Sequence, residues 1–151
     1  MPRLDAGRVA TWRAFGLVAA DMQRNVEAGL IDDWDLPLAW FEILAALQAA
    51  GGSLRVGELC DVLHELPSSL SRRVDRLQGE GFVDRVSTPT PDDRRAVTVS
   101  LTRDGRAEWR DANVTYRRMV QQHFAKVLSD TDVAALQRIF TKLGAQRPKS
   151  S

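Results

Sequence analysis

One stretch of the chain carries hydroxyl and guanidinium side chains at spacings suited to contact with a nucleic acid. Apolar residues recur there at steps of three and four, which predicts a helix over Pro67–Gly79 with one buried side. That side would hold Leu70, Val74 and Leu77. The opposite side would present Ser68, Ser69, Arg72, Arg73 and Arg76. Small hydroxyl side chains allow close approach to base edges, and arginine forms bidentate hydrogen bonds with guanine and phosphate, so we expect this helix to contact duplex DNA.

Periodic segments on both sides of this helix predict the elements that position it. Further helices are expected over residues 8–30, 37–50 and 56–64, from an N-cap at Thr102 to about Leu128, and from a capping box formed by Ser129 and Asp132. An acidic linker, Ile31–Asp35, would separate the first two helices. After Gly81 the period changes to two, so residues 82–88 and 96–101 predict two strands joined by a polar loop that contains prolines.

Short helices followed by a two-stranded hairpin have the order of a winged helix-turn-helix. In that arrangement two short helices brace each other across a tight turn, and the second enters a major groove about 12 Å wide. The predicted fold class is therefore mainly α with a small β-hairpin wing (α+β), with the terminal helices forming a dimerisation region. A solvated, arginine-rich face is the alternative for an isolated helix, but the hairpin directly afterwards favours DNA contact.

The composition of the 151 residues is that of a globular protein, with 44% hydrophobic and 27% charged residues. The net charge is +1, with −3 on residues 1–50 and +4 on the remainder, a pattern that permits DNA binding but does not establish it, because a composition bias of a GC-rich genome would also enrich arginine. No stretch is apolar enough for a membrane span and no secretion signal is recognisable, which favours a cytoplasmic protein. The single cysteine rules out an intramolecular disulfide, and we expect no metal, cofactor or enzymatic activity.

Four segments together resemble the MarR family of bacterial transcriptional regulators. They are Gly57–Leu63, Pro67–Leu77, Gly81–Arg85 and Asp92–Gly105. The Asp-Arg-Arg run at 93–95, which leads into a Leu-Thr-x-x-Gly segment, is the most specific part, because many regulators share a helix-turn-helix alone. The resemblance implies a symmetric dimer that binds a pseudo-palindromic operator in double-stranded DNA, usually represses transcription, and releases DNA when a small aromatic effector binds.

The resemblance also implies roles for individual residues. The side chains nearest the bases would be Ser68, Ser69 and Arg72, and those nearer the DNA backbone Arg73 and Arg76. Arg94 matches a wing-tip arginine that enters the minor groove, where a narrow groove concentrates negative potential. Asp93 and Arg95 match an acid–base pair that stiffens the wing. Leu66 stands where the family often has a serine N-cap, so the start of the helix needs another hydrogen-bond acceptor.

The two ends of the chain are expected to form one region. Residues 1–35 and 103–146 would make a helical dimerisation region, residues 36–102 the DNA-binding region, and residues 147–151 a flexible tail. The apolar stripes of the terminal helices exceed what the small winged core can cover, which favours a dimer over an intramolecular bundle. Trp12, Phe15 and Trp40 are candidates for a ligand pocket, although aromatic residues at helical spacing more often belong to a core.

Two functions therefore remain open at this point. The first is a dimeric, ligand-responsive repressor that binds DNA. The second is a winged-helix module that docks another protein and never binds DNA. Repeated phosphate contacts make affinity for a duplex fall steeply as salt rises, so salt dependence separates the two.

Overall fold

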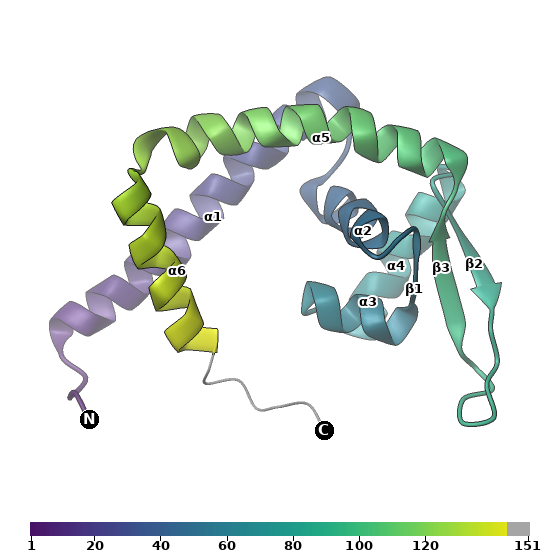
Figure 1. The fold of residues 1–151 in the computed structure, drawn as a ribbon, viewed down its shortest axis with the longest axis horizontal. Coiled ribbons are helices and arrows are strands. Elements are labelled where there is room, and N and C mark those ends of the chain that lie inside the picture. Colours follow the sequence, from purple (N-terminus) through teal and green to yellow (C-terminus); the bar gives the residue numbers. More distant parts are fainter. Residues whose placement is uncertain (145–151) are drawn as a thin grey trace.

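The helices and strands follow the predicted order, with one additional strand (Figure 1). This computed structural model describes residues 1–144. Its elements are α1 (Ala6–Trp34), α2 (Leu38–Ala49), β1 (Ser53–Arg55), α3 (Val56–Leu63), α4 (Pro67–Gly79), β2 (Val83–Ser87), β3 (Val97–Leu101), α5 (Arg103–His123), the 3-10 turn η1 (Ala125–Val127) and α6 (Asp130–Gly144). The predicted tail, residues 147–151, lies outside the described residues. No helix within this range combines the length and apolar composition needed to cross a bilayer.

Local signals in the sequence determine where three helices begin. α4 starts at Pro67, whose fixed φ and missing N–H suit the first helical position. The hydroxyl of Thr102 accepts a hydrogen bond from the N–H of Gly105 at 3.0 Å and caps α5. At α6 the Ser129 hydroxyl accepts from the Asp132 N–H at 3.2 Å, and the Asp132 carboxylate accepts from the Ser129 N–H at 2.9 Å. These predicted starts are confirmed.

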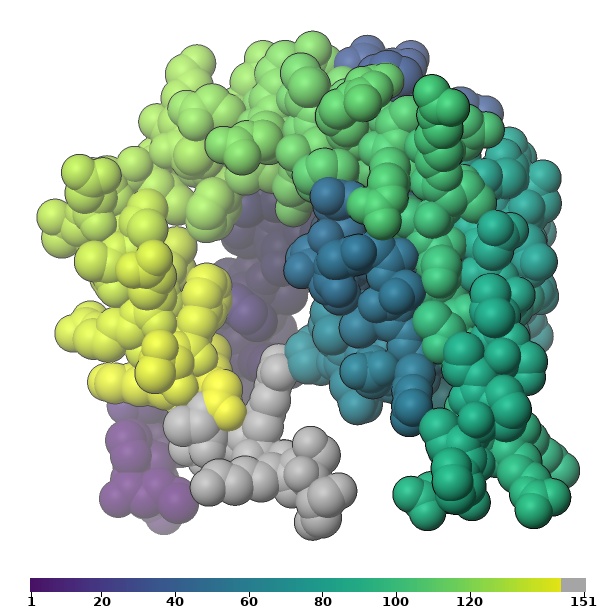
Figure 2. Space-filling model, turned by 45° about the vertical axis from the view of Figure 1, so that its right-hand side comes forward, coloured from purple at the N-terminus to yellow at the C-terminus, as the bar shows by residue number. Residues whose placement is uncertain are grey.

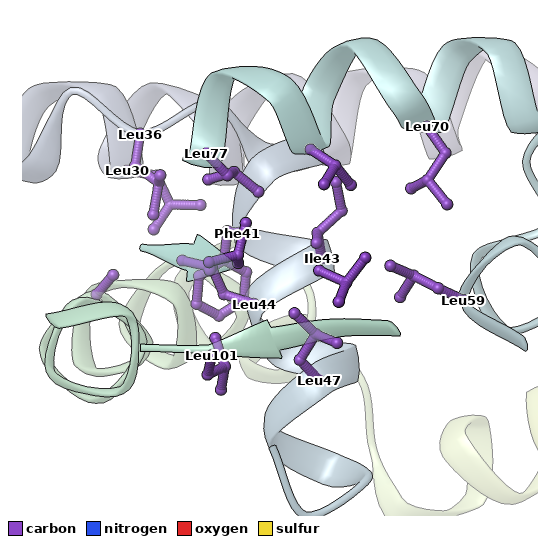
Figure 3. Packing of buried hydrophobic residues seen from close by; sticks show 14 of the residues in the cluster. Leu30, Leu36, Phe41, Ile43, Leu44, Leu47, Leu59, Leu70, Leu77 and Leu101 are labelled. Carbon is purple, nitrogen blue, oxygen red and sulfur yellow. The ribbon is translucent and has the colours of Figure 1, made fainter. Parts of the chain in front are cut away.

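The hydrophobic core is built around α2 (Figure 3). Four side chains of α2 are almost fully buried: Phe41, Ile43, Leu44 and Leu47. Around them pack buried side chains from five other elements: Leu30, Leu59, Leu70, Val74, Leu77, Val83, Val99 and Leu101. Because all three apolar residues predicted for the inner side of α4 lie in this core, the arginine-bearing side of α4 is turned outward.

The wing belongs to an antiparallel sheet of three strands in the order β1-β3-β2. β2 and β3 form the predicted hairpin, with Val83 opposite Leu101. β1 pairs with the other edge of β3 and places Leu54 opposite Val99. The predicted two-stranded hairpin is therefore confirmed, and β1 is a third strand that the sequence analysis missed, because three residues are too few to show a period of two.

A polar contact joins the end of α1 to the middle of α5. The Thr115 hydroxyl donates to the Asp33 carboxylate at 2.7 Å and accepts from the indole N–H of Trp34 at 3.0 Å. Arg118 donates to the same carboxylate oxygen at 2.7 Å. The hydrogen bonds from Thr115 and Arg118 hold the pKa of Asp33 below its ordinary value. The contact fixes the angle at which α1 leaves α5.

Two predicted boundaries were wrong. The segment Ile31–Asp35 is helical except for its last residue, because the contacts with α5 hold it; α1 ends where Asp35 adopts a left-handed φ of 51°. The fifth helix, expected to reach Leu128, stops just before Phe124, whose φ of −123° and ψ of −62° depart from helical values. The turn η1 then redirects the chain into α6.

The turn from β3 into α5 contains the Leu-Thr-x-x-Gly segment singled out in the sequence. The Thr102 hydroxyl donates to the carbonyl oxygen of Gly81 at 2.6 Å, and the Thr102 N–H donates to the carbonyl oxygen of Phe82 at 3.0 Å. A Cβ atom on Gly105 would lie 1.9 Å from the Phe82 carbonyl oxygen, so no side chain fits there. Backbone therefore packs directly on backbone where α5 meets the start of β2.

The molecule has the shape of an arch with α5 across its top (Figures 1 and 2). On one side lies the body, residues 38–101, which holds most of the core. On the other side lies the arm, which we define as residues 6–18 of α1 together with α6. The arm has no buried residue, and its exposed apolar side chains include Trp12, Phe15, Ile139, Phe140 and Leu143. It thus presents an apolar surface that the described chain does not cover.

Candidate nucleic-acid interface

The outward side of α4 carries polar side chains without partners. Its exposed members are Ser68, Ser69, Arg72 and Arg76. Within residues 1–144, none of these four side chains takes part in a hydrogen bond or an ion pair with another side chain. Because the inner side of the same helix is fixed in the core, the four side chains project from a rigid support.

The first turn of α4 also lacks a side-chain cap. Leu66 occupies the N-cap position and is 72% exposed, and no side chain accepts a hydrogen bond from the first backbone N–H groups of the helix. The acceptor that the sequence analysis called for is therefore not supplied by a described side chain. Free N–H groups at a helix start attract anions such as phosphate.

Arg73 differs from the other arginines of α4. Its guanidinium forms an ion pair with Glu65, which lies between α3 and α4, and its side chain is about as buried as that of Glu65. The resemblance implies that Arg73 lies near the DNA backbone, and in the structure its partly exposed side chain forms an ion pair within the chain. This ion pair ties α4 to the end of α3.

Arg85 on β2 is a residue to which the sequence analysis gave no role. Its guanidinium pairs with Asp75 of α4 and donates to the Ser71 carbonyl oxygen at 2.9 Å and the Ser71 hydroxyl at 3.2 Å. It therefore fixes the wing against α4, which sets the distance between two surfaces that would have to contact the same duplex. The segment Gly81–Arg85 was part of the resemblance, but only the fold brings Arg85 to α4.

Hydrogen bonds within the loop hold the wing tip. Thr90 and Asp93 exchange backbone hydrogen bonds at 2.8 and 3.1 Å, and the Asp93 carboxylate accepts from the backbone N–H of Arg95 at 2.9 Å. Among the described residues, no ion pair joins the Asp93 and Arg95 side chains, so Asp93 contacts Arg95 through the backbone instead of through charge. Arg94 is exposed, and its side chain has no described partner. The tip of the wing extends beyond the body (Figure 1).

A cavity of about 850 Å³ opens between α1, α2, α3 and α5. Its apolar lining includes Met22, Val26, Leu38, Val62, Leu63, Tyr116, Val120 and Phe124. Its polar lining consists of Gln23, Arg24, Glu27, Glu42, Glu65 and His123. Figure 2 shows the molecule hollowed beneath α5, between the body and the arm. The volume is that of a small-molecule site.

The aromatic residues suggested by the sequence do not line this cavity. Trp12 and Phe15 stack on each other in the arm with ring centroids 6.4 Å apart, and Trp12 is 73% exposed. Trp40 of α2 packs against the core. The aromatic side chains that line the cavity are instead Tyr116 and Phe124, and the Tyr116 ring stacks on Phe41 with ring centroids 4.5 Å apart. Sequence periodicity placed Tyr116 on the apolar side of its helix but could not indicate which neighbouring element it faces.

Burial shifts the titration of two groups in the cavity wall. Desolvation raises the pKa of Glu42, and desolvation together with the charge of Glu42 raises the pKa of Tyr116.

Cys60 is buried in the core, and burial raises the pKa of its thiol, which is the behaviour of a structural cysteine. Across residues 1–144, no group of three potential metal ligands lies close enough to hold an ion.

Known proteins are similar to this chain over the region that contains α4 and most of the wing. Residues 34–96, which contain α2–α4 and β2, match the MarR family. The multiple antibiotic resistance protein MarR of Salmonella typhimurium is 32% identical over 109 residues, covering 72% of this chain and 74% of that protein. The MarR protein of Escherichia coli strain K12 matches at the same identity and over the same share of both chains.

Solved structures extend the similarity to the whole chain. Sco3205, a MarR family transcriptional regulator from Streptomyces coelicolor crystallised in complex with DNA, is 25% identical with a TM-score of 0.87 and covers 99% of this chain and 94% of its own. A mutant of Escherichia coli MarR complexed with operator DNA is 27% identical with a TM-score of 0.80, covering 94% of this chain and 99% of its own. The chain therefore belongs to the MarR family of winged-helix, DNA-binding transcriptional regulators.

Proposed function

We propose that the protein is a homodimeric repressor that binds a pseudo-palindromic operator in the cytoplasm and leaves it when a small aromatic ligand binds. The observation that carries this proposal is the outward side of α4, where two serines and two arginines stand without partners on a helix anchored in the core. Side chains with no partner inside the protein are available to base edges and phosphates.

The geometry supports a division of roles within the DNA-binding surface. Ser68, Ser69 and Arg72, at the start of α4, would contact base edges, and the uncapped N–H groups there would bind phosphate. Arg76, one turn further along, would contact the DNA backbone. Arg94 at the wing tip would enter the adjacent minor groove. These are direct contacts, so each predicts a loss of DNA affinity when the side chain is removed.

Three other residues would act by holding these contacts in place. Arg73 stays paired with Glu65, so its contribution to the DNA backbone contact is indirect unless the pair opens. Asp93 would set the conformation of the wing through the backbone N–H of Arg95, leaving the Arg95 guanidinium available for phosphate. The wing-stabilising role of this pair is therefore assigned to a backbone hydrogen bond.

The arm supports the dimer. Two copies that bury the apolar side chains of the arm against each other would remove them from water, which α1 and α6 cannot do within one chain. Residues 1–35 and 103–146 would then form the dimerisation region and residues 36–102 the DNA-binding region. A two-fold axis would place the two copies of α4 about 34–36 Å apart, one turn of DNA. Trp12 and Phe15 would belong to this contact.

The cavity beneath α5 supports the response to a ligand. Its walls come from α1 and α5 on one side and from α2 and α3 on the other, so a bound molecule would touch both the dimerisation region and the DNA-binding region. Tyr116 and Phe124 offer aromatic surface for a ring. A ligand that binds one spacing of these helices more tightly than another would shift the protein away from the DNA-binding spacing.

Selection of bound duplexes from a random pool tests the proposal. The expected result is an inverted repeat with half-sites one helical turn apart, bound by two chains, with an affinity that falls by orders of magnitude between low and physiological salt. The alternative function, a winged-helix module that docks another protein, would be supported by two results together. The selected duplexes would share no sequence, and the chain would bind another protein with an affinity that does not depend on salt. Recovery of a single half-site would contradict the dimer but not DNA binding.

A further inference from the structure

The cavity beneath α5 has an acidic wall. Three carboxylates line it, those of Glu27, Glu42 and Glu65. The basic residues in its lining are Arg24, which forms an ion pair with Asp21, and His123 at the end of α5. An aromatic acid placed here would meet the negative charge of Glu42, which forms no ion pair with any described residue, and like charges in a partly desolvated site repel.

The three carboxylates differ in how well their hydrogen bonds are satisfied. Glu27 accepts a hydrogen bond from the backbone N–H of Leu38 at 2.8 Å and caps the start of α2. The Glu42 carboxylate is half-buried and has no hydrogen bond or ion pair with any described residue. In Glu65 one oxygen pairs with Arg73, while the other, Oε2, is buried and has no partner. Glu42 and Glu65 therefore both lack donors that a ligand would supply.

We propose that the effector bound in this cavity is an amphipathic organic cation, with a protonated amine held by Glu42 and Glu65 and an apolar ring against Tyr116 and Val62. This inference rests on the proposed function, because it names the chemical class of the ligand for the same cavity. An ammonium group offers three hydrogen-bond donors and a positive charge, which match one unpartnered carboxylate and one half-satisfied carboxylate. Tyr116 and Val62 supply apolar surface for the ring of the same ligand.

The titration of the cavity wall agrees with this assignment. Burial raises the pKa of Glu42, which means that its ionised form lacks the stabilisation that water or a cation would give. Desolvation and, after it, the negative charge of Glu42 raise the pKa of Tyr116. A ligand cation beside Glu42 would offset the part of this shift that comes from the Glu42 charge.

The Glu65–Arg73 ion pair connects the cavity to the DNA-binding helix. Glu65 lines the cavity, and Arg73 is part of α4. An ammonium group that binds Glu65 competes with Arg73 for the same carboxylate, so ligand binding loosens the tie between α3 and α4. The ligand and the operator then disfavour each other, and linkage requires the same factor in both directions.

Three probes with one ring system and different charges test the ligand class. They are 1-naphthylmethylammonium, 1-naphthylmethanol and 1-naphthoate, each titrated by calorimetry into the full chain without DNA. We expect the ammonium probe to bind about ten-fold more tightly than the alcohol and the carboxylate to bind most weakly, since one charge-assisted hydrogen bond contributes about that factor. Equal affinities, preference for naphthoate, or no binding by any probe up to millimolar concentration would overturn the proposal.

A variant without the Glu42 charge tests whether the ammonium probe binds in this cavity. Glu42→Gln keeps the size of the side chain, and we expect it to weaken the ammonium probe about ten-fold while leaving the alcohol unchanged. The matched control is Glu80→Gln, an exposed glutamate at the end of α4 that is not part of the cavity lining. An unchanged ammonium affinity in Glu42→Gln, or the same loss in Glu80→Gln, would place the probe elsewhere and overturn the assignment.

Measurement of operator affinity with and without the ammonium probe tests the connection to α4. In the wild type we expect the probe to weaken DNA binding several-fold, and in Arg73→Gln we expect that ratio to approach one while the probe still binds. A ratio that is unchanged in Arg73→Gln would overturn the role of the ion pair. Operator binding without the probe is read in the same experiment, so a failure of the cation proposal leaves the regulator proposal separately tested.

Discussion

The body and the arm are made of the same kinds of helix but differ in what they bury. In the body, Leu44, Leu59, Leu70 and Leu77 are fully buried against one another. In the arm, the large apolar side chains Phe15, Ile139, Phe140 and Leu143 are all exposed. The body thus encloses its apolar surface within one chain, whereas the arm has apolar surface left over.

This difference separates the two tasks that a DNA-binding dimer must perform. A DNA-contacting helix needs a fixed position in each subunit, and a core closed within the chain provides it. A dimer contact needs a surface that stays incomplete until a second copy arrives. In this chain the incomplete surface lies on the N-terminal part of α1 and on α6, away from α4.

The largest expected effect is on the body. Leu44→Ala should lower the free energy of unfolding by about 2–5 kcal/mol, because it removes a fully buried side chain and leaves a cavity in the core. Urea denaturation at low protein concentration measures the loss. The matched control is Leu143→Ala in the arm, which should change stability little under conditions where the dimer is dissociated. Equal losses at both positions would contradict the distinction between body and arm.

The next effect concerns the arm. Phe140→Asp should weaken self-association by about 2 kcal/mol, roughly 30-fold in Kd, because it places a charge in the surface that the second copy would cover. Sedimentation equilibrium measures the dimer Kd, and circular dichroism checks that the helices remain. Val86→Asp, at an exposed apolar position of the wing, is the control and should leave the dimer intact. A dimer unaffected by Phe140→Asp would move the contact to another surface.

A third pair of variants separates the contacts within the body. Arg72→Ala should cost about 1–3 kcal/mol of operator binding and relax sequence preference, because it would remove the base contact proposed for this side chain. Arg94→Ala should weaken operator binding with a nearly unchanged thermal midpoint, because its side chain has no partner in the described chain. Arg117→Ala, an exposed arginine of α5, is the control. If Arg72→Ala instead lowered the affinity for all DNA sequences equally, Arg72 would contact phosphate and not a base.

The smallest effect lies where α1 and α5 join the two regions. The pKa of Asp33 is lowered in the folded state, so its stabilising contribution is complete above the unfolded value near 3.8 and fades as pH falls through the lower folded value. Asp33→Asn should therefore lower the thermal midpoint near neutral pH, and the difference from the wild type should vanish in acid. Asp32→Asn, at an exposed neighbouring position, should show no such difference. A gap that persists in acid would mean that the Asp33 contacts do not depend on its charge.

Much of the fold was predictable because its signals are local. Pro67 marks the start of α4, and Thr102, Ser129 and Asp132 cap the next helices; each acts on backbone groups within a few residues. The inner side of α4 was predictable for the same reason, since a helical period needs only its own segment. With one side buried, the outward position of Arg72 followed.

The parts that could not be predicted depend on residues far apart in the chain. The extension of α1 through Asp33 depends on Thr115, and β1 exists only because β3 offers an edge to Leu54. The partners of Arg73 and Arg85 likewise come from other elements, so the sequence could count these arginines but not distinguish the engaged ones from the available ones. The position of Tyr116 in the cavity wall likewise depends on how α5 packs against α1 and α2, which the sequence of α5 does not indicate.

The contact between Gly105 and the Phe82 carbonyl oxygen has a mechanical consequence. Because no side chain separates Gly105 from Phe82, α5 and the β2–β3 hairpin are in direct backbone contact, and we expect them to move as one rigid unit. In the proposed dimer, a change in tilt at the two-fold axis would then move the wing tips instead of being absorbed by a flexible hinge. We expect the separation of the two tips, which labels on the wings would report, to track the angle between the two copies of α5.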